Sequence, residues 1–131
     1  MAPAEDTPLP TDASPGAFSV ATLTKRPDFL RAARAGRAPC PAFLLQARQR
    51  APDEPSQTQI RVGFTCSKKV GNAVARNRAK RRLREVARAV LPLEGQPGWD
   101  YVLIGRKDET ATRDFVAMQD DLRRALRKLH R

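Results

Sequence analysis

The sequence predicts an α+β fold, a single-domain two-layer sandwich in which helices cover one face of a β-sheet. Residues 73–91 and 113–129 repeat apolar side chains at the α-helical period, whereas residues 58–66 alternate apolar and polar side chains as a β-strand does. The length of 131 residues suits one domain, and 40% hydrophobic residues allow a small core. The predicted order of elements is α-β-β-α-β-α.

The first 21 residues have the composition of a disordered, proline-rich tail. They combine four prolines with three acidic side chains and offer little that could enter a core. We therefore expect the folded domain to span residues 22–131. The prolines and acidic residues of the tail are Pro3, Glu5, Asp6, Pro8, Pro10, Asp12 and Pro15.

A short helix and a strand are predicted next. Residues 27–34 have a proline in the first turn and Gly36 just beyond the end, which is the usual placement of these residues around a helix. Residues 41–48 alternate in the manner of a strand, and residues 50–56 contain two prolines and form a loop.

Residues 58–66 form the clearest predicted strand, with two different faces. The apolar face should contact the long helix and consists of Ile60, Val62, Phe64 and Cys66. The polar face is open enough for an extended RNA strand to cross it, although a merely solvated face would have the same pattern. It consists of Gln59, Arg61, Gly63 and Thr65.

The long helix of residues 73–91 has an apolar stripe and an opposite cationic face. We expect Pro92 to end it. The stripe comprises Ala75, Ala79, Leu83, Val86 and Val90, and the far side carries the i, i+4 row Arg76, Lys80, Arg84 and Arg88. Residues 99–106 then predict an apolar strand, and residues 113–129 a second amphipathic helix. The inner side of this last helix comprises Phe115, Met118, Leu122, Leu126 and Leu129.

Most of the net charge of +11 lies between residues 68 and 88. This segment has nine cationic side chains against the single carboxylate of Glu85, which we expect to pair with Arg81 or Arg88. Solvated helix faces usually mix signs, because like charges four residues apart repel each other. The concentration of cations therefore predicts a polyanion as partner, and the pI near 11 favours nucleic acid.

The same segment resembles the signature of the bacterial ribonuclease P protein component. The similar runs are SKKVGNAV over residues 67–74, RNRAKR over residues 76–81 and LRE over residues 83–85, and a weaker likeness extends over residues 23–129. The resemblance implies a ribosomal-protein-S5-domain-2-like fold, with one extra short strand allowed and a left-handed βαβ crossover between Cys66 and Trp99. The residues alone would favour a right-handed crossover, which is the rule for parallel βαβ units.

The resemblance also implies a function. In this family the RNA subunit is the catalyst and uses Mg²⁺ to hydrolyse the bond that frees the 5′ leader of precursor tRNA. The protein binds the RNA subunit and the leader, so catalytic residues and metal ligands are not expected in this chain. The residues implied in RNA binding are Lys68, Lys69, Asn72, Arg76, Asn77, Arg78, Lys80, Arg81, Arg84 and Arg88.

A leader cleft is expected between the polar sheet face and the N-terminal helix. Its candidate residues are Phe29, Phe43, Arg61, Gly63 and Thr65. The sequence departs from the family pattern at two positions, where Ala33 and Gln46 replace aromatic residues. Because stacking on an aromatic side chain is worth about 1–3 kcal/mol per base, leader binding should depend more on charge here.

Other classes of function have less support. Metal-dependent phosphodiester hydrolysis needs several converging carboxylates, and two cysteines without a CxxC pair give little support for zinc. We expect both thiols to be free, and we expect the protein to be monomeric because nothing in the chain suggests a dimer seam. A cytoplasmic location is expected because the chain has neither a membrane-spanning run nor a secretion signal. The main alternative is a structural RNA-binding protein of ribosomal type, followed by a DNA-binding recognition helix and an autonomous nuclease.

Overall fold

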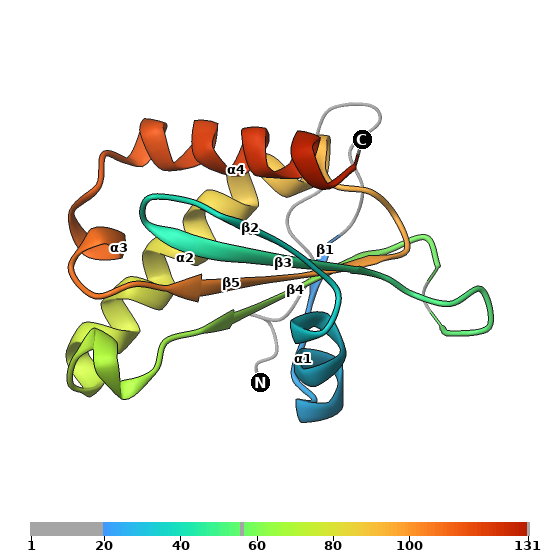
Figure 1. Cartoon of the computed structure of the whole chain (residues 1–131), viewed down its shortest axis with the longest axis horizontal. Coiled ribbons are helices and arrows are strands. Elements are labelled where there is room, and N and C mark those ends of the chain that lie inside the picture. The colour runs from blue at the N-terminus through green and yellow to red at the C-terminus, as the bar shows by residue number, and fades with distance from the viewer. Residues whose placement is uncertain (1–19, 56, 131) are drawn as a thin grey trace.

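A computed structural model describes residues 20–55 and 57–130 as one five-stranded sheet with helices on both faces (Figure 1). The strands are β1 (Val20–Thr22), β2 (Gly36–Pro39), β3 (Phe43–Gln49), β4 (Ile60–Thr65) and β5 (Trp99–Gly105). The helices are α1 (Arg26–Ala33), α2 (Ala73–Glu94), α3 (Glu109–Thr112) and α4 (Phe115–Leu129), and a 3₁₀ turn, η2 (Lys68–Val70), precedes α2.

The sheet has the strand order β1-β4-β5-β3-β2 and is mixed. β2 and β3 are antiparallel, as are β3 and β5, whereas β4 is parallel to both β5 and β1. In Figure 1 the arrows of β4 and β5 both point to the left, and α2 returns behind the sheet while the chain moves up from β4 to β5. The crossover is therefore left-handed, as the family resemblance implies and against the general rule.

The main core lies between the sheet and the pair α2 and α4. Phe43, Leu45 and Ile60 from the strands meet Leu83 and Met118 from the helices, and all five are fully buried. A second, smaller cluster on the opposite face joins α1 to the sheet. It comprises Leu23, Phe29, Ala32, Val102 and Ile104. The predicted two-layer sandwich is thus confirmed, with α1 covering part of the other sheet face.

Both edge strands were missed by the sequence patterns. β1 begins at Val20, inside the predicted tail, and pairs with β4; residues 1–19 of that tail lie outside the described residues. β2 contains Gly36 and Pro39, which have poor strand propensity. It forms because β3 supplies hydrogen-bond partners, and Pro39 is tolerated at an edge strand.

The long helix continues through Pro92 and ends at Glu94, so the predicted end at Leu91 was wrong. A proline removes only one intrahelical bond, here the one to the carbonyl of Arg88, and the next turn still closes. The Gly95 amide donates to the Leu91 carbonyl at 2.9 Å.

Both cysteines are free thiols in the described part of the chain, as predicted. Cys40 is buried, and burial is the main reason why its pKa rises to about 11. Cys66 is half-buried and its pKa is raised for the same reason. Neither thiol is therefore activated as a nucleophile at neutral pH.

Candidate RNA-binding surface

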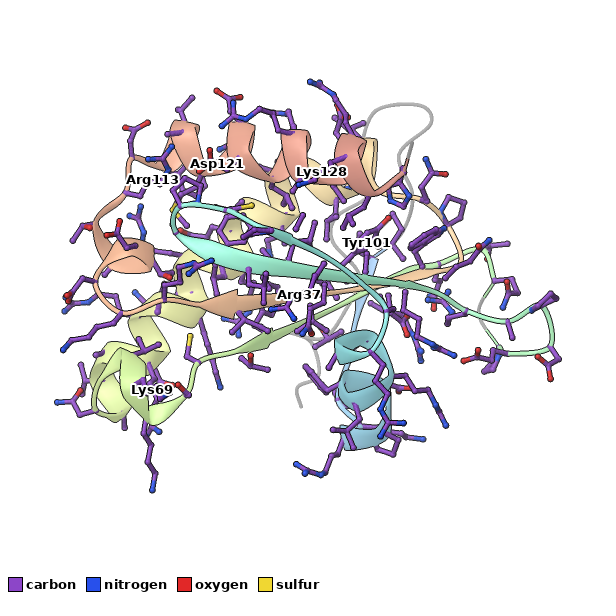
Figure 2. The ribbon with its side chains drawn as sticks, viewed as in Figure 1. Arg37, Lys69, Tyr101, Arg113, Asp121 and Lys128 are labelled. Atoms are coloured by element: carbon purple, nitrogen blue, oxygen red, sulfur yellow. The ribbon has the colours of Figure 1, made fainter. Side chains whose placement is uncertain are left out.

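The turn before α2 is built by local hydrogen bonds. The Ser67 hydroxyl accepts from the Lys69 amide at 3.2 Å, and the Asn72 side chain caps α2 by accepting from the Ala75 amide at 2.9 Å. Gly71 has φ of 148°, and a Cβ there would lie 2.8 Å from that of Ala75, so the turn requires glycine. The turn thereby fixes Lys68 and Lys69 at the start of the helix, where Figure 2 shows Lys69 well away from Arg113 and Asp121.

The packing of α2 turns its cations away from the core. Leu83, Val86 and Val90 are buried in the core with the sheet and α4, and Ala79 is buried as well. Among the predicted RNA-binding residues, Arg76 and Lys80 are half-buried and the others are exposed. We call the following eight cations the α2 surface: Lys68, Lys69, Arg76, Arg78, Lys80, Arg81, Arg84 and Arg88.

No cation of the α2 surface forms an ion pair with any residue in the ranges 20–55 and 57–130. Glu85 is exposed, and the described chain gives it no ion pair either, so the predicted pairing with Arg81 or Arg88 was wrong. One contact does orient a member of the surface. The guanidinium carbon of Arg84 lies 5.7 Å from the centroid of the Phe64 ring, within range of a cation–π interaction.

Arg82 differs from its neighbours on α2 because it holds the fold together. Its guanidinium donates to the carbonyls of Thr110, at 2.9 Å, and of Arg113. It therefore ties α2 to α3 and to the residue that follows α3. Charge alone could not have separated Arg82 from the RNA-binding candidates beside it.

The polar face of the sheet contains a buried carboxylate surrounded by arginines. Asp100 is fully buried and accepts from Arg50 at 2.5 Å, from Arg61 at 2.8 Å and from Arg48 at 3.5 Å. Two further carboxylates extend the group: Asp28 lies 3.6 Å from Arg61 and 3.2 Å from Arg31, and Glu54 lies 2.6 Å from Arg48. We call these residues the arginine network: Arg31, Arg48, Arg50 and Arg61 with Asp28, Glu54 and Asp100.

Arg61 was predicted to offer its charge to RNA, and the structure instead engages it with protein carboxylates. Its hydrogen bond to Asp100 raises the pKa of the Arg61 guanidinium. The sequence did carry a signal for this network, since Asp100 is an acidic residue within an otherwise apolar strand.

Gly63 and Phe29 are packed against each other under α1. A Cβ on Gly63 would lie 2.4 Å from a ring carbon of Phe29 and 3.1 Å from the Cβ of Leu23. Gly63 is consequently buried, and the sheet face is not open at this point, contrary to the prediction. Phe29 and Thr65 remain half-exposed beside it.

Phe43 is not a cleft residue. It is fully buried in the core formed with α2 and α4, because the alternation of β3 turns it to the helix side of the sheet. Gln46 points to the opposite side but is itself 8% exposed, and Ala33 is exposed on α1. Of the predicted cleft residues, Phe29, Arg61 and Thr65 are thus partly exposed, and Arg61 is at the same time engaged by carboxylates.

The described ranges contain no group of three or more His, Cys, Asp or Glu side chains placed to hold a metal ion. Their helices also lack a stretch with the length and apolar content of a membrane span. The described residues instead present a cationic face, that of α2.

Comparisons with known proteins agree with these observations. The family model described as Ribonuclease P matches residues 19–130. The ribonuclease P protein component of Ruegeria pomeroyi is 66% identical over 111 residues, which cover 85% of this chain and 87% of that protein. That of Caulobacter vibrioides is 50% identical over 113 residues, or 86% and 73% of the two chains.

Solved structures give the same result for the fold. The ribonuclease P protein of Thermotoga maritima has 27% identity and a TM-score of 0.59, over 82% of this chain and 94% of the other. The ribonuclease P protein of Staphylococcus aureus has a TM-score of 0.60 over 82% and 93% of the two chains, at 23% identity, which speaks for the fold alone. The basic motif, the fold and the sequence relatives together show that this chain belongs to the family of bacterial ribonuclease P protein components.

Proposed function

We propose that the protein binds the catalytic RNA subunit of ribonuclease P through the α2 surface and contacts the 5′ leader of precursor tRNA beside α1. In this role it strengthens and broadens substrate binding, while the RNA hydrolyses the phosphodiester bond that yields the mature tRNA 5′ end. The observation that carries the proposal is the α2 surface, in which eight cations lie together without an ion pair to any described residue.

The chemistry of the side chains suits phosphate binding. Arg76, Arg78 and Arg81 can each donate two parallel hydrogen bonds to a phosphate, and Lys80 acts as a point charge. Asn77 is exposed and can both donate to and accept from a sugar or base. Each phosphate that is neutralised releases counterions, so affinity should fall steeply as salt rises.

The protein is assigned no catalytic step and no metal ion of its own. The Mg²⁺ needed for hydrolysis is proposed to be held by the RNA subunit. Asp28 of α1 and Asp100 of β5 are both engaged by arginines, which makes them poor ligands for a further cation. Both the monomeric state of the free protein and its cytoplasmic location remain predictions from the sequence.

Cleavage of a precursor tRNA at low Mg²⁺ by a bacterial ribonuclease P RNA tests the proposal. We expect efficient cleavage at the mature 5′ end with RNA plus protein, weak cleavage with RNA alone and none with protein alone. Arg76→Ala/Lys80→Ala should lose most of the stimulation. Arg127→Ala/Lys128→Ala removes the same two charges from exposed positions on α4 and should retain it.

Two results would contradict the proposal. If the protein leaves the cleavage rate of the RNA unchanged, the alternative of a structural RNA-binding protein of ribosomal type is favoured. If both double variants lose the same stimulation, net charge and not the α2 surface accounts for the effect.

A further inference from the structure

A groove of about 420 Å³ opens at the N-terminal end of α1. Its walls are the end of β1 at Thr22, the linker of residues 23–25, the first turns of α1 and the loop that carries Glu54, and Arg61 of β4 also lines it. The volume lies within the range of sites that bind small molecules or single nucleotides. The predicted leader cleft did not include the linker or the loop.

The groove is on a different side of α1 from Phe29. Asp28 is turned towards the sheet, and at about 100° per residue Phe29 lies on one side of it and Arg31 on the other. Arg31 lines the groove, whereas the ring of Phe29 packs over Gly63. α1 therefore has a separate polar hollow on the side away from its aromatic residue.

The charged groups of the groove are held in fixed positions. Asp28 lies between Arg31 and Arg61, at 3.2 and 3.6 Å. Glu54 accepts from Arg48 at 2.6 Å and from the Ala51 amide at 2.7 Å. Since a carboxylate offers about four lone-pair positions, each can accept further hydrogen bonds from a ligand.

Lys25 supplies the remaining positive charge. It is exposed, it lines the groove from the linker, and the described residues give it no ion pair. Pro27 of α1 and Pro55 of the loop add apolar surface to the walls. The groove thus combines a cation, anchored carboxylate acceptors and apolar walls, which match a phosphate, the amino group of a base and the face of a base or sugar.

We propose that this groove binds one nucleotide of single-stranded RNA whose base carries an exocyclic amino group. Lys25 contacts the phosphate, and Glu54, the more exposed of the two carboxylates, accepts from the amino group, as carboxylates do from the N4 amino group of cytosine. The site rests on the proposed function only in taking RNA as the ligand. The groove would be a second RNA contact of α1, on the side away from Phe29. It would select against uracil, because uracil has a carbonyl where cytosine has an amino group.

Cytidine and uridine tetranucleotides are suitable probes, because both are pyrimidines and differ in this group. We would titrate the full-length chain with each and follow the backbone amides of Thr22 and Thr24, which line the groove, by NMR. Changes in these two signals report binding in the groove and distinguish it from binding of RNA at the α2 surface. We expect about 5-fold tighter binding of the cytidine probe.

Three variants and one competitor complete the test. Glu54→Gln should abolish the preference for cytidine, since an amide can donate to uracil as well as accept from cytosine. Lys25→Ala should weaken both probes by about 5-fold. Arg26→Ala removes the adjacent exposed cation, which does not line the groove, and should weaken them by less than about 2-fold. Cytidine monophosphate should compete only weakly, because the site is proposed to bind a nucleotide within a strand. Competition as strong as that of the tetranucleotide would contradict this and indicate a site for a free nucleotide.

Equal affinity for the two probes, or equal effects of Lys25→Ala and Arg26→Ala, would overturn the inference. Lys25 lies on an exposed linker, so its variant stays informative even if Glu54→Gln were to unfold the chain. The titration contains no catalytic RNA. Its failure is therefore distinguishable from a failure of the proposed function, which is judged from cleavage by the Arg76→Ala/Lys80→Ala variant.

Discussion

The α2 surface and the arginine network use the same kind of side chain in opposite ways. The cations of the α2 surface form no ion pair with any residue that the structure describes, whereas Arg31, Arg48, Arg50 and Arg61 each contact a carboxylate. The difference lies in the neighbouring carboxylates and, for Arg48, Arg50 and Arg61 but not for the exposed Arg31, also in burial. A buried arginine is stable only when paired, while an exposed cluster of cations repels itself until a polyanion binds.

This comparison assigns the two regions different tasks. The arginine network links β3, β4 and β5 and fixes α1 over the sheet, so its charges serve the fold. The α2 surface keeps its charges available, so they serve a partner. Substitutions in the first region should therefore lower stability, and substitutions in the second should lower RNA affinity.

The largest effect is expected for Asp100→Ala. It leaves Arg48, Arg50 and Arg61 without the carboxylate that they share, and removing one partner of a buried pair typically costs about 3–5 kcal/mol. Urea unfolding followed by Trp99 fluorescence measures the free energy of unfolding. Asp120→Ala is the matched control, because its pair with Arg123 is exposed and worth less than about 1 kcal/mol. Similar losses in the two variants would show that the network contributes little to the fold.

The opposite pattern is expected for Arg76→Ala/Lys80→Ala. Affinity for the ribonuclease P RNA subunit should fall by about 10–100-fold, since hydrogen bonds from charged groups are worth about 1.5–3 kcal/mol each. The free energy of unfolding should stay the same or rise by a few tenths of a kcal/mol, because a repulsion at i, i+4 is relieved. Filter binding and urea unfolding measure the two quantities. A large loss of stability would mean that the α2 surface also holds the fold.

A smaller effect is expected for Gly63→Ala, which tests how packing adds to the ion pairs beneath α1. The new Cβ would overlap the Phe29 ring, and overpacking of this kind costs about 1–3 kcal/mol. Combining it with Phe29→Leu should recover part of the loss, since the shorter side chain leaves room. Unchanged stability of Gly63→Ala would show that α1 can move off the sheet without cost.

The smallest effect concerns pH. The hydrogen bond from Arg48, and then that from the Ala51 amide, lower the pKa of Glu54 in the folded protein. The folded state then binds fewer protons than the unfolded state, so Glu54 contributes stability above its unfolded pKa near 4.5 that is lost as pH falls through the lowered value. Because the side chain is partly exposed, the contribution should not exceed about 1 kcal/mol. In urea unfolding between pH 6 and pH 3, Glu54→Gln should show a shallower acid limb than the parent chain, and parallel curves would contradict the assignment.

The regular parts of the fold could be predicted because they follow local periodicity. The stripe on α2, the inner side of α4 and the apolar face of β4 are all set by the spacing of side chains along the chain. The two edge strands could not be predicted in this way. β1 and β2 are short and have weak patterns, and they exist because β4 and β3 offer them hydrogen-bond partners.

The candidate site likewise has features that follow from local sequence and features that depend on tertiary contacts. The sequence by itself determined the charge of the α2 surface, its place on one side of a helix and the glycine turn that precedes it, because helix geometry and turn chemistry are local. Only the tertiary structure decided that Arg61 and Arg82 are engaged by the protein, that Phe29 covers Gly63 and that Phe43 faces the core. These outcomes depend on which distant segments meet. An acidic residue within an apolar strand, such as Asp100, signals that a cation pairs with it, but which cation does so is set by segments elsewhere in the chain, as is the cover of a glycine.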